Sequence, residues 1–493
     1  MKKFILSMIT FALVFSACNN VQSDDERNQQ YKNYEHLLAD YKLVSLNLDT
    51  NILTDNEKQI IPIFKEIGNK IDELFWFQSY GIRDSLPKQK DSILNQLLEI
   101  NFGPWSRFKN NDPFIDGIGN KPLGANFYPA DMEKKEFMGF EDSSKTSPFN
   151  FIRRNDEGNL ITIPYSKARP QEMAQISGLF KKAATICLDP AYKKYLNLKS
   201  QSFLTDEYEI SDAAWLETQN NHLDFIAGPI EIFDDRLLGF KAEFESFLFI
   251  KDSVQTREYA KYVLMLPYLQ KALPVSEIYR HEDPEYISGL SVANILDCGG
   301  AAKAGGYSIS VTYPSAFNKT ASKKRVIIQF KNIIDAKYQN ILLPIAKLII
   351  DPEQQNLLSK EAFFQNNLFS ELGIRLGIKE VLITGEPVRS TLKEYATLMD
   401  LVKAYAMSLY IAEKLYSVGE IKDLNSNYIV FLSEIFRTLR FGKSSSFSQS
   451  KVIIFNYLMS ENAIQRNLHG YYKINQDKIK ASIEKLINEV LVL

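Results

Sequence analysis

Histidine is scarce in this chain of 493 residues: only His36, His222, His281 and His469 occur, and they lie far apart in the sequence. No Cys-x-x-Cys or His-x-x-x-His pair is present either. These are the local spacings from which most protein zinc sites are built. The composition therefore argues against an ordinary zinc centre formed by one short motif.

An excess of charge of either sign is also missing. The chain has 58 basic and 60 acidic residues, which gives a net charge of -2. Proteins that bind a phosphate backbone usually carry a clear basic excess, so nucleic acid is not an expected partner. With 45% hydrophobic residues, 22 Gly and 18 Pro, the chain has the composition of a globular protein with a large core, and its length predicts two or three structural units.

Long apolar runs are absent except at the N-terminus. The basic start of the chain is followed by an apolar stretch over residues 4–15, which is shorter than the roughly 20 residues that a membrane-spanning helix needs. We interpret residues 1–17 as a secretory signal peptide. Small residues lead to Cys18, as in a bacterial lipobox, and the polar residues 18–30 are expected to form a flexible tether.

The expected consequence is a protein anchored to the membrane through a diacylated Cys18, rather than one that spans it. The expected location is the bacterial cell envelope, at its outer membrane. The alternative is an ordinary cleaved signal with an incidental cysteine. Cys187 and Cys298 then remain; export would permit a disulfide between them, but two buried free thiols are the favoured interpretation.

Helical periodicity dominates the rest of the sequence. Apolar residues recur at intervals of three and four over residues 60–75 and 392–416, which predicts two amphipathic helices. Strand patterns are fewer. Residues 307–312 alternate between apolar or aromatic and polar side chains, and residues 325–330 are rich in β-branched side chains. Residues 101–131 are rich in Gly, Pro and Asn and are predicted to form an ordered loop packed on the core.

A stretch at residues 363–377 carries the main functional signal. It reads Phe-Phe-Gln-Asn-Asn-Leu-Phe-Ser-Glu-Leu-Gly-Ile-Arg-Leu-Gly, and it resembles the zinc-binding helix of the dipeptidyl peptidase III family of metallopeptidases, which in bacterial and plant members reads His-Glu-x-x-His-Gly-Leu-Gly. Further segments resemble that family in the same order along the chain. They are residues 103–105, 113–115, 124–132, 211–215, 228–231, 239–242, 436–442 and 455–458.

The resemblance implies that the family's metal ligands are replaced in this chain. Ser370 and Ile374 stand where the two histidines would be, and only Glu371 keeps the family residue, the general base. The third ligand of the family is the second Glu of a Glu-Glu pair, and that pair falls on Asp400 and Leu401. A serine hydroxyl and two hydrocarbon side chains do not supply the nitrogen, sulfur or carboxylate ligands that zinc requires. No cofactor is therefore expected.

Other positions of the family site are changed as well. A further acidic residue of the family falls on Tyr405, and the histidine that stabilises the transition state falls on Phe447. The two asparagines that hold the peptide fall on Thr312 and Ser315. The expected substrate cleft is lined by Gly228, Glu231, Thr312, Ser315 and Asp400.

By resemblance, the expected fold is α+β and mostly helical, with two lobes flanking a wide cleft. Residues 31–250 and 291–335 would form a lower lobe with a small β core, and residues 251–290 and 336–493 a helical upper lobe. The expected function is that of a lipid-anchored, catalytically inactive relative of dipeptidyl peptidase III, whose cleft binds peptides or a partner. The alternative is an active zinc-dependent dipeptidyl aminopeptidase or other hydrolase with a relocated metal site.

Overall fold

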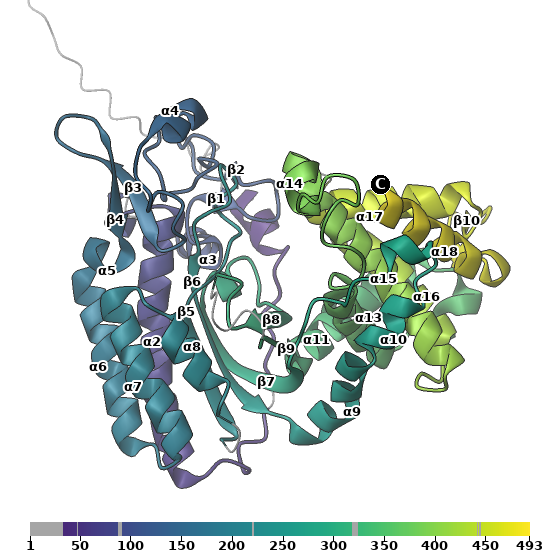
Figure 1. Ribbon diagram of the computed structural model, residues 1–493, viewed down its shortest axis with the longest axis horizontal. Helices are drawn as coiled ribbons and strands as arrows, with labels where there is room; N and C mark the ends of the chain where they lie inside the picture. The colour runs from purple at the N-terminus through teal and green to yellow at the C-terminus, as the bar shows by residue number, and fades with distance from the viewer. Residues whose placement is uncertain are drawn as a thin grey trace, which may run out of the picture.

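Two lobes of different construction make up the protein (Figure 1). The computed structural model describes residues 33–46, 48–86, 91–218, 221–317, 324–440, 442 and 445–493. The predicted signal peptide, Cys18 and the tether lie outside these residues. Within the described part of the chain, no helix has the length and apolar character needed to cross a membrane.

Helices account for most of the described chain. After a helical segment over residues 33–38, the lower lobe contains α2 (Asp55–Ser79), α3 (Ser92–Asn101), α4 (Lys134–Gly139), α5 (Tyr165–Ala168), α6 (Pro170–Ile186), α7 (Pro190–Thr205) and α8 (Glu209–Trp215). The helices that follow are α9 (Ser253–Leu264), α10 (Leu266–Lys271), α11 (Lys331–Lys337), α12 (Leu343–Ile349), α13 (Lys360–Gly373), α14 (Val388–Leu392), α15 (Ala396–Ser417), α16 (Leu424–Leu439), α17 (Ser446–Ser460) and α18 (Gln476–Val492).

Short 3-10 segments interrupt these helices, and one segment is a π-helix. The 3-10 segments are η1 (Arg83–Ser85), η2 (Glu277–Tyr279), η3 (Ala301–Lys303), η5 (Pro352–Leu357) and η6 (Lys393–Tyr395). The π-helical segment η4 (Tyr338–Leu342) continues directly from α11. It lets α11 and α12 run on as one winding stretch that packs against α16.

A five-stranded sheet joins the lobes. Its strands are β5 (Leu223–Glu231), β6 (Glu243–Lys251), β7 (Gly289–Gly300), β9 (Val326–Phe330) and β8 (Ser310–Tyr313), in the order β5-β6-β7-β9-β8. Only the β7–β9 pair is parallel. Three two-stranded sheets complete the set: β1 (Trp105–Ser106) with β2 (Asp112–Pro113), β3 (Asn150–Arg154) with β4 (Leu160–Pro164), and β10 (Ile464–Arg466) with β11 (Tyr472–Ile474).

Strand β7 contributes to both hydrophobic cores. Its residues Ala293 and Ile295 belong to the core of the lower lobe, whereas Leu290 and Val292 belong to the core of the helical lobe. Successive side chains of a strand point to opposite faces of the sheet. The alternation along β7 therefore presents one apolar face to each lobe, which ties the two lobes together.

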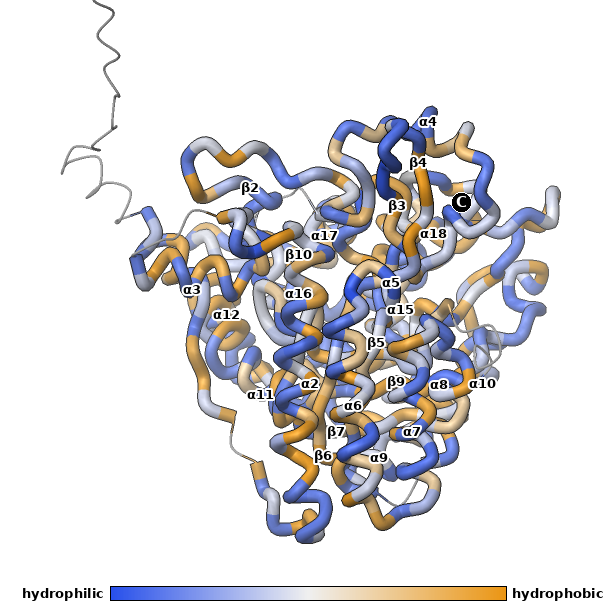
Figure 2. Tube along the Cα trace, turned by 90° about the vertical axis from the view of Figure 1, so that its left-hand side faces the viewer, coloured by the Kyte–Doolittle hydropathy of each residue, from blue (hydrophilic) through white to orange (hydrophobic). Residues whose placement is uncertain are grey.

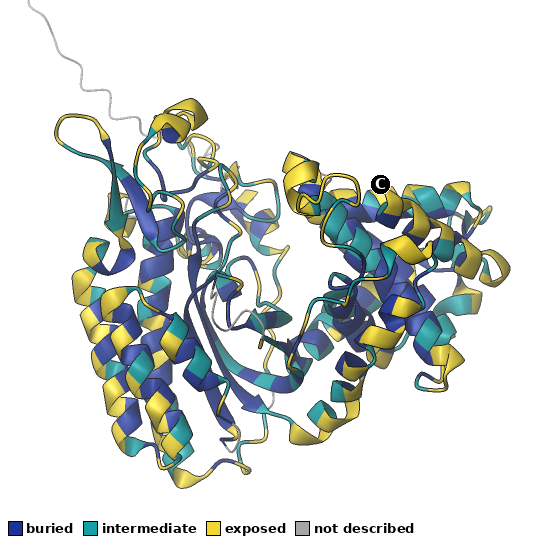
Figure 3. Cartoon of the chain, in the orientation of Figure 1, coloured by how far each residue is buried: buried dark blue, intermediate teal, exposed yellow. Residues whose placement is uncertain are grey.

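The helices cover the sheet with their apolar faces. Helices α2, α6 and α7 pack beside β5 and β6 in the lower lobe, and their exposed residues lie on the outer side while the sheet is buried (Figure 3). Polar and apolar residues alternate along these helices (Figure 2), as an amphipathic helix requires. The helical lobe is built around α13 and α15, with α16, α17 and α18 packed on α15.

The predicted fold class is confirmed: the protein is α+β, mostly helical and two-lobed. The predicted helices correspond to α2 and to η6 with α15, and the predicted strands to β8 and β9. Pro62 lies inside α2. Cys187 and Cys298 are free and buried, as favoured. The residue boundaries of the predicted lobes stay predictions.

Candidate functional site

Helix α13 carries the positions that the resemblance assigns to the zinc ligands. Ser359 caps its N-terminus by accepting a hydrogen bond from the Ala362 backbone amide, and the helix ends at Gly373. Ser370 and Ile374 are four residues apart and therefore share a face. The Ser370 hydroxyl donates to the Asn367 carbonyl at 2.8 Å, so its hydrogen is used within the helix itself.

Helix α15 lies unusually close to α13 at this point. A Cβ atom added to Gly373 would lie only 2.5 Å from Cβ of Met407, so only glycine permits this approach. Ala404 of α15 lies at the same contact, because its carbonyl oxygen would be 3.2 Å from that added Cβ, and Leu401 and Tyr405 lie within one turn of Ala404 on α15. Ile374 and Leu401 are both half-buried, and they offer hydrocarbon rather than ligand atoms.

Glu371 lies where the helical lobe meets the sheet. The Ser310 hydroxyl, on β8, donates to Glu371 Oε1 at 3.0 Å. Glu231, at the end of β5, is influenced by the same carboxylate. Burial and, secondly, the charge of Glu371 raise the pKa of Glu231 to about 7, while Arg325 opposes the shift. One carboxyl group from each lobe therefore faces the same space.

A second link between the lobes surrounds Arg375, directly after α13. Its Nη1 donates to Glu285 Oε1 at 2.9 Å and its Nη2 donates to Thr312 Oγ1 at 3.4 Å. Arg325 also reaches Glu285, at 3.4 Å. The buried Nε of Arg375 has no hydrogen-bond partner among the described residues. Thr312, on strand β8, is thus held at the junction beside an arginine with one unused donor.

Two other predicted cleft residues have contacts within the lower lobe. The Ser315 hydroxyl is buried and donates to the Ile230 carbonyl at 2.8 Å. Gly228 has a φ of 151°, and a Cβ there would lie 3.3 Å from the Tyr208 ring. Both residues sit beside the end of β5 that carries Glu231. The Ser315 hydrogen bond and the close approach of Gly228 to Tyr208 fix the packing at that end of the strand.

Two residues at the rim of the helical lobe are more exposed. Asp400 forms an ion pair with Arg389 of α14. Burial lowers the pKa of the Lys403 ammonium, and the charges of Asp400 and Glu285 oppose that shift. Phe447, at the start of α17, is 47% exposed. An exposed phenyl ring has no polar atom with which to stabilise an oxyanion.

The sequence reasoning missed a buried ammonium group in this lobe. Lys451 of α17 is 3% exposed, and its Nζ lies 3.5 Å from the ring centroid of Tyr405 and 4.5 Å from that of Phe431. Burial lowers its pKa to about 8, and the charge of Glu434 opposes that shift. Asn367, one turn before Ser370, donates to Glu434 Oε1 at 3.3 Å. A lysine in a helical sequence usually indicates an exposed face, so no local pattern marks it.

A line of buried carboxyl groups on β6 was missed as well. Glu243 and Glu245 are fully buried. The pKa of Glu245 lies well above its ordinary value because of burial and of the charges of Glu231 and Glu243. These carboxyls have the alternating spacing of a strand, but nothing local to the sequence shows that both faces of β6 are buried.

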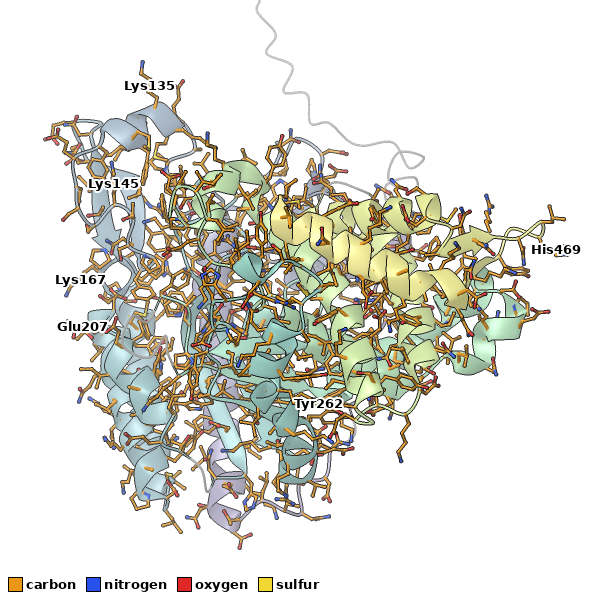
Figure 4. All side chains as sticks on the ribbon, turned by 45° about the vertical axis from the view of Figure 1, so that its right-hand side comes forward. Lys135, Lys145, Lys167, Glu207, Tyr262 and His469 are labelled. Atoms are coloured by element: carbon orange, nitrogen blue, oxygen red, sulfur yellow. The ribbon has the colours of Figure 1, made fainter. Side chains whose placement is uncertain are left out.

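The residues present do not fit a zinc ion. Zinc sites use histidine, cysteine or carboxylate ligands, and the described residues contain no group of three or more such side chains that could hold a metal. None of the four histidines lies on α13 or α15. His469, for example, lies at the outer tip of the helical lobe (Figure 4).

The fold and the site together define a two-lobed α+β protein in which a helix pair and an edge strand face one another. The sequence model of peptidase family M49 matches residues 136–358. The protein resembles the structure of DPP III from Caldithrix abyssi with a TM-score of 0.86 and 31% identity, covering 93% of this chain and 90% of that one. The chain therefore belongs to peptidase family M49, the dipeptidyl peptidase III family. That family is zinc-dependent, whereas the described residues of this chain do not fit the metal.

The chain is also similar to two other proteins. Dipeptidyl-peptidase III from Corallococcus sp. strain EGB superimposes with a TM-score of 0.85 at 26% identity, over 93% of this chain and 88% of that chain. A protein named Nudix hydrolase 3, from Arabidopsis thaliana, is 26% identical over 524 residues, which cover 92% of this chain and 68% of the relative.

Proposed function

We propose that this protein is a peptide-binding member of the dipeptidyl peptidase III family without zinc-dependent peptidase activity. The observation that carries the proposal is the donor set on α13 and α15. Ser370 uses its hydroxyl hydrogen within the helix, and Ile374 and Leu401 have no ligand atoms. Without a metal, the site lacks both the Lewis acid and the activated water of the family's chemistry, and Glu371 alone is a poor hydrolase.

Peptide binding is supported by the surface between the lobes. Strand β8 is at the edge of the five-stranded sheet, and its Ser310 and Thr312 are only partly buried. An edge strand can pair with an extended peptide through main-chain hydrogen bonds. Glu231 and Glu371 stand beside it, and a carboxylate there suits the ammonium end of a peptide. Of the other predicted cleft residues, Asp400 would border that surface, whereas Gly228 and Ser315 are buried beneath it.

The test combines metal content, cleavage and binding on the purified protein. We expect less than stoichiometric zinc, no chelator-sensitive release of dipeptides, and measurable binding of short peptides by calorimetry. A Glu231→Gln variant should weaken binding of peptides with a free amino terminus, while Glu207→Gln, on the outer surface (Figure 4), serves as the matched control. Cleavage that chelator abolishes would overturn the proposal in favour of an active zinc-dependent dipeptidyl aminopeptidase.

We also propose that the protein is a lipoprotein of the bacterial cell envelope, anchored at the outer membrane. Support comes from the basic start, the short apolar run and the small residues before Cys18. An acylated cysteine followed by a polar tether would hold the two lobes at the membrane surface, where they could meet extracytoplasmic peptides.

A further inference from the structure

A cavity of about 340 Å³ lies on α2 in the lower lobe. One wall is a face of α2 that includes Asp72, Glu73 and Trp76, and the other walls are the segment around η1, the end of α3, and Arg169 at the start of α6. Helix α2 lies on the side of the five-stranded sheet that faces away from the helical lobe (Figure 1). The cavity is therefore separate from the cleft, and its volume suits a small molecule.

Two N–H groups of the cavity walls are buried without an acceptor. Trp76 is only 4% exposed, and its indole Nε1 has no hydrogen-bond partner among the described residues. The same holds for Nε of Arg169. Because most buried donors in proteins are paired, two unpartnered donors at one cavity point to an acceptor that is not part of the chain.

Aromatic rings support both arginines that line the cavity. The guanidinium of Arg83 lies 4.8 Å from the ring centroid of Trp76, and that of Arg169 lies 4.9 Å from the ring centroid of Phe77. Contact with a ring face leaves the N–H groups at the edge of a guanidinium available. Nη2 of Arg169 pairs with Glu172, which leaves its Nε as an oriented donor, suited to a carboxylate oxygen.

Most carboxylates that line the cavity are already engaged. Ion pairs join them to neighbouring cations: Asp72 to Lys303, Glu73 to Lys70, and Glu99 to Arg83. Asp84, on η1, also lines the cavity and is exposed. Among the described residues Asp84 has no ion-pair partner, so its carboxylate is available to a cationic group.

The groups left over define the charge of a suitable ligand. The donors of Trp76 and Arg169 require an acceptor, which a simple cation does not have. A simple anion would meet the carboxylate of Asp84 without compensation. A molecule that carries both charges satisfies both sides. Phe102 and the 65% exposed Ile82 add apolar surface to the same cavity, on which a hydrocarbon side chain can pack.

We propose that this cavity binds a small zwitterion, an α-amino acid or a dipeptide with apolar side chains. Its carboxylate accepts from Trp76 and Arg169, and its ammonium group faces Asp84. The site goes beyond the proposed peptide binding in the cleft, because none of the residues that line the cavity is a predicted cleft residue.

The experiment compares four probes on the full chain by ligand-observed NMR titration. Two are zwitterions, L-leucine and L-leucyl-L-leucine. The third, N-acetyl-L-leucine, lacks the ammonium group, and the fourth, L-leucinamide, lacks the carboxylate. We expect the better zwitterion to bind about 10- to 100-fold more tightly than the third or fourth probe, the range for hydrogen bonds to charged groups. Which zwitterion binds more tightly distinguishes an amino acid from a dipeptide.

Variants assign each end of the ligand to its partner. Trp76→Phe keeps a ring but removes the indole N–H, and Arg169→Lys keeps the charge but removes Nε. Each should reduce the preference over leucinamide to a few-fold and keep the preference over N-acetylleucine. Asp84→Asn should do the reverse, and Asp156→Asn, exposed between β3 and β4, is its matched control. Circular dichroism verifies folding, and Arg169→Lys supplies the same test if Trp76→Phe does not fold.

The outcomes separate this site from the cleft. If neither zwitterion binds, or all four probes bind equally, the cavity site is wrong and the cleft proposal is unaffected. If Glu231→Gln abolishes zwitterion binding while the cavity variants leave it unchanged, the ligand occupies the cleft and the cavity site is wrong. Preferences that survive in Arg169→Lys and in Asp84→Asn would also overturn it.

Discussion

Replacing Ser370, Ile374 and Leu401 tests most directly whether these residues occupy the zinc-ligand positions of the family. The triple variant Ser370→His, Ile374→His and Leu401→Glu should acquire zinc binding, because two histidines four residues apart on α13 and a glutamate on the adjoining α15 restore a three-ligand set. The close approach of the two helices at Gly373 and Met407 makes the geometry available.

The expected magnitudes follow from burial and from linkage. Ile374 and Leu401 are half-buried, so losing their apolar contacts should cost about 1 kcal/mol each, roughly half of the value for a fully buried side chain. Zinc at a thousand times its dissociation constant adds about 4 kcal/mol to the free energy of unfolding. The variant should therefore be less stable than wild type without zinc and more stable with it.

Thermal unfolding with and without zinc, together with elemental analysis after dialysis, measures both effects. The matched control is Ser370→Ala, Ile374→Ala and Leu401→Gln, which removes the same apolar contacts but supplies no ligand set. Catalysis is not expected to return fully, because Phe447, Thr312 and Ser315 remain. A triple variant with unchanged circular dichroism that takes up no zinc would show that these residues do not occupy the ligand positions.

The remaining predictions concern wild-type zinc, pH and the anchor. Wild-type protein should show no rise in unfolding temperature when zinc is added, and one zinc per chain retained through dialysis against a weak chelator would contradict this. The pKa of Glu231 in the folded protein, about 7, lies above its unfolded value. The Glu231 carboxyl therefore stabilises the folded state at low pH, and this stabilisation is lost as the pH rises from about 4.5 through 7. Glu231→Gln should raise the free energy of unfolding by about 2 kcal/mol at pH 8 but not at pH 4. An equal effect at both values would refute the assignment. Cys18→Ser should release the protein from membranes or stall its processing, and an unlipidated N-terminus found by mass spectrometry on membrane-extracted protein would be the contrary result.

The sequence by itself was sufficient for the features that depend on local spacing. Ligand positions on one helix are four residues apart, so the sequence predicts the replacement of histidine by Ser370 and Ile374 without coordinates once the helix resembles the family's. That assignment stays a prediction. Amphipathic periodicity likewise located α2 and α15, and β-branched or alternating residues located β8 and β9. The order of several short matches along the chain indicated the two-lobed fold.

Only the tertiary structure decided which distant side chains share a site. Lys451 and Tyr405 meet through the packing of α17 on α15. The charge of Arg437 reaches Lys337 because α16 packs against η4, which follows α11. Each of these residues is unremarkable in its own helix. The altered pKa values of Lys451, Tyr405 and Lys337 arise from burial and from charges contributed by other elements. Both causes depend on long-range packing that local sequence patterns do not encode.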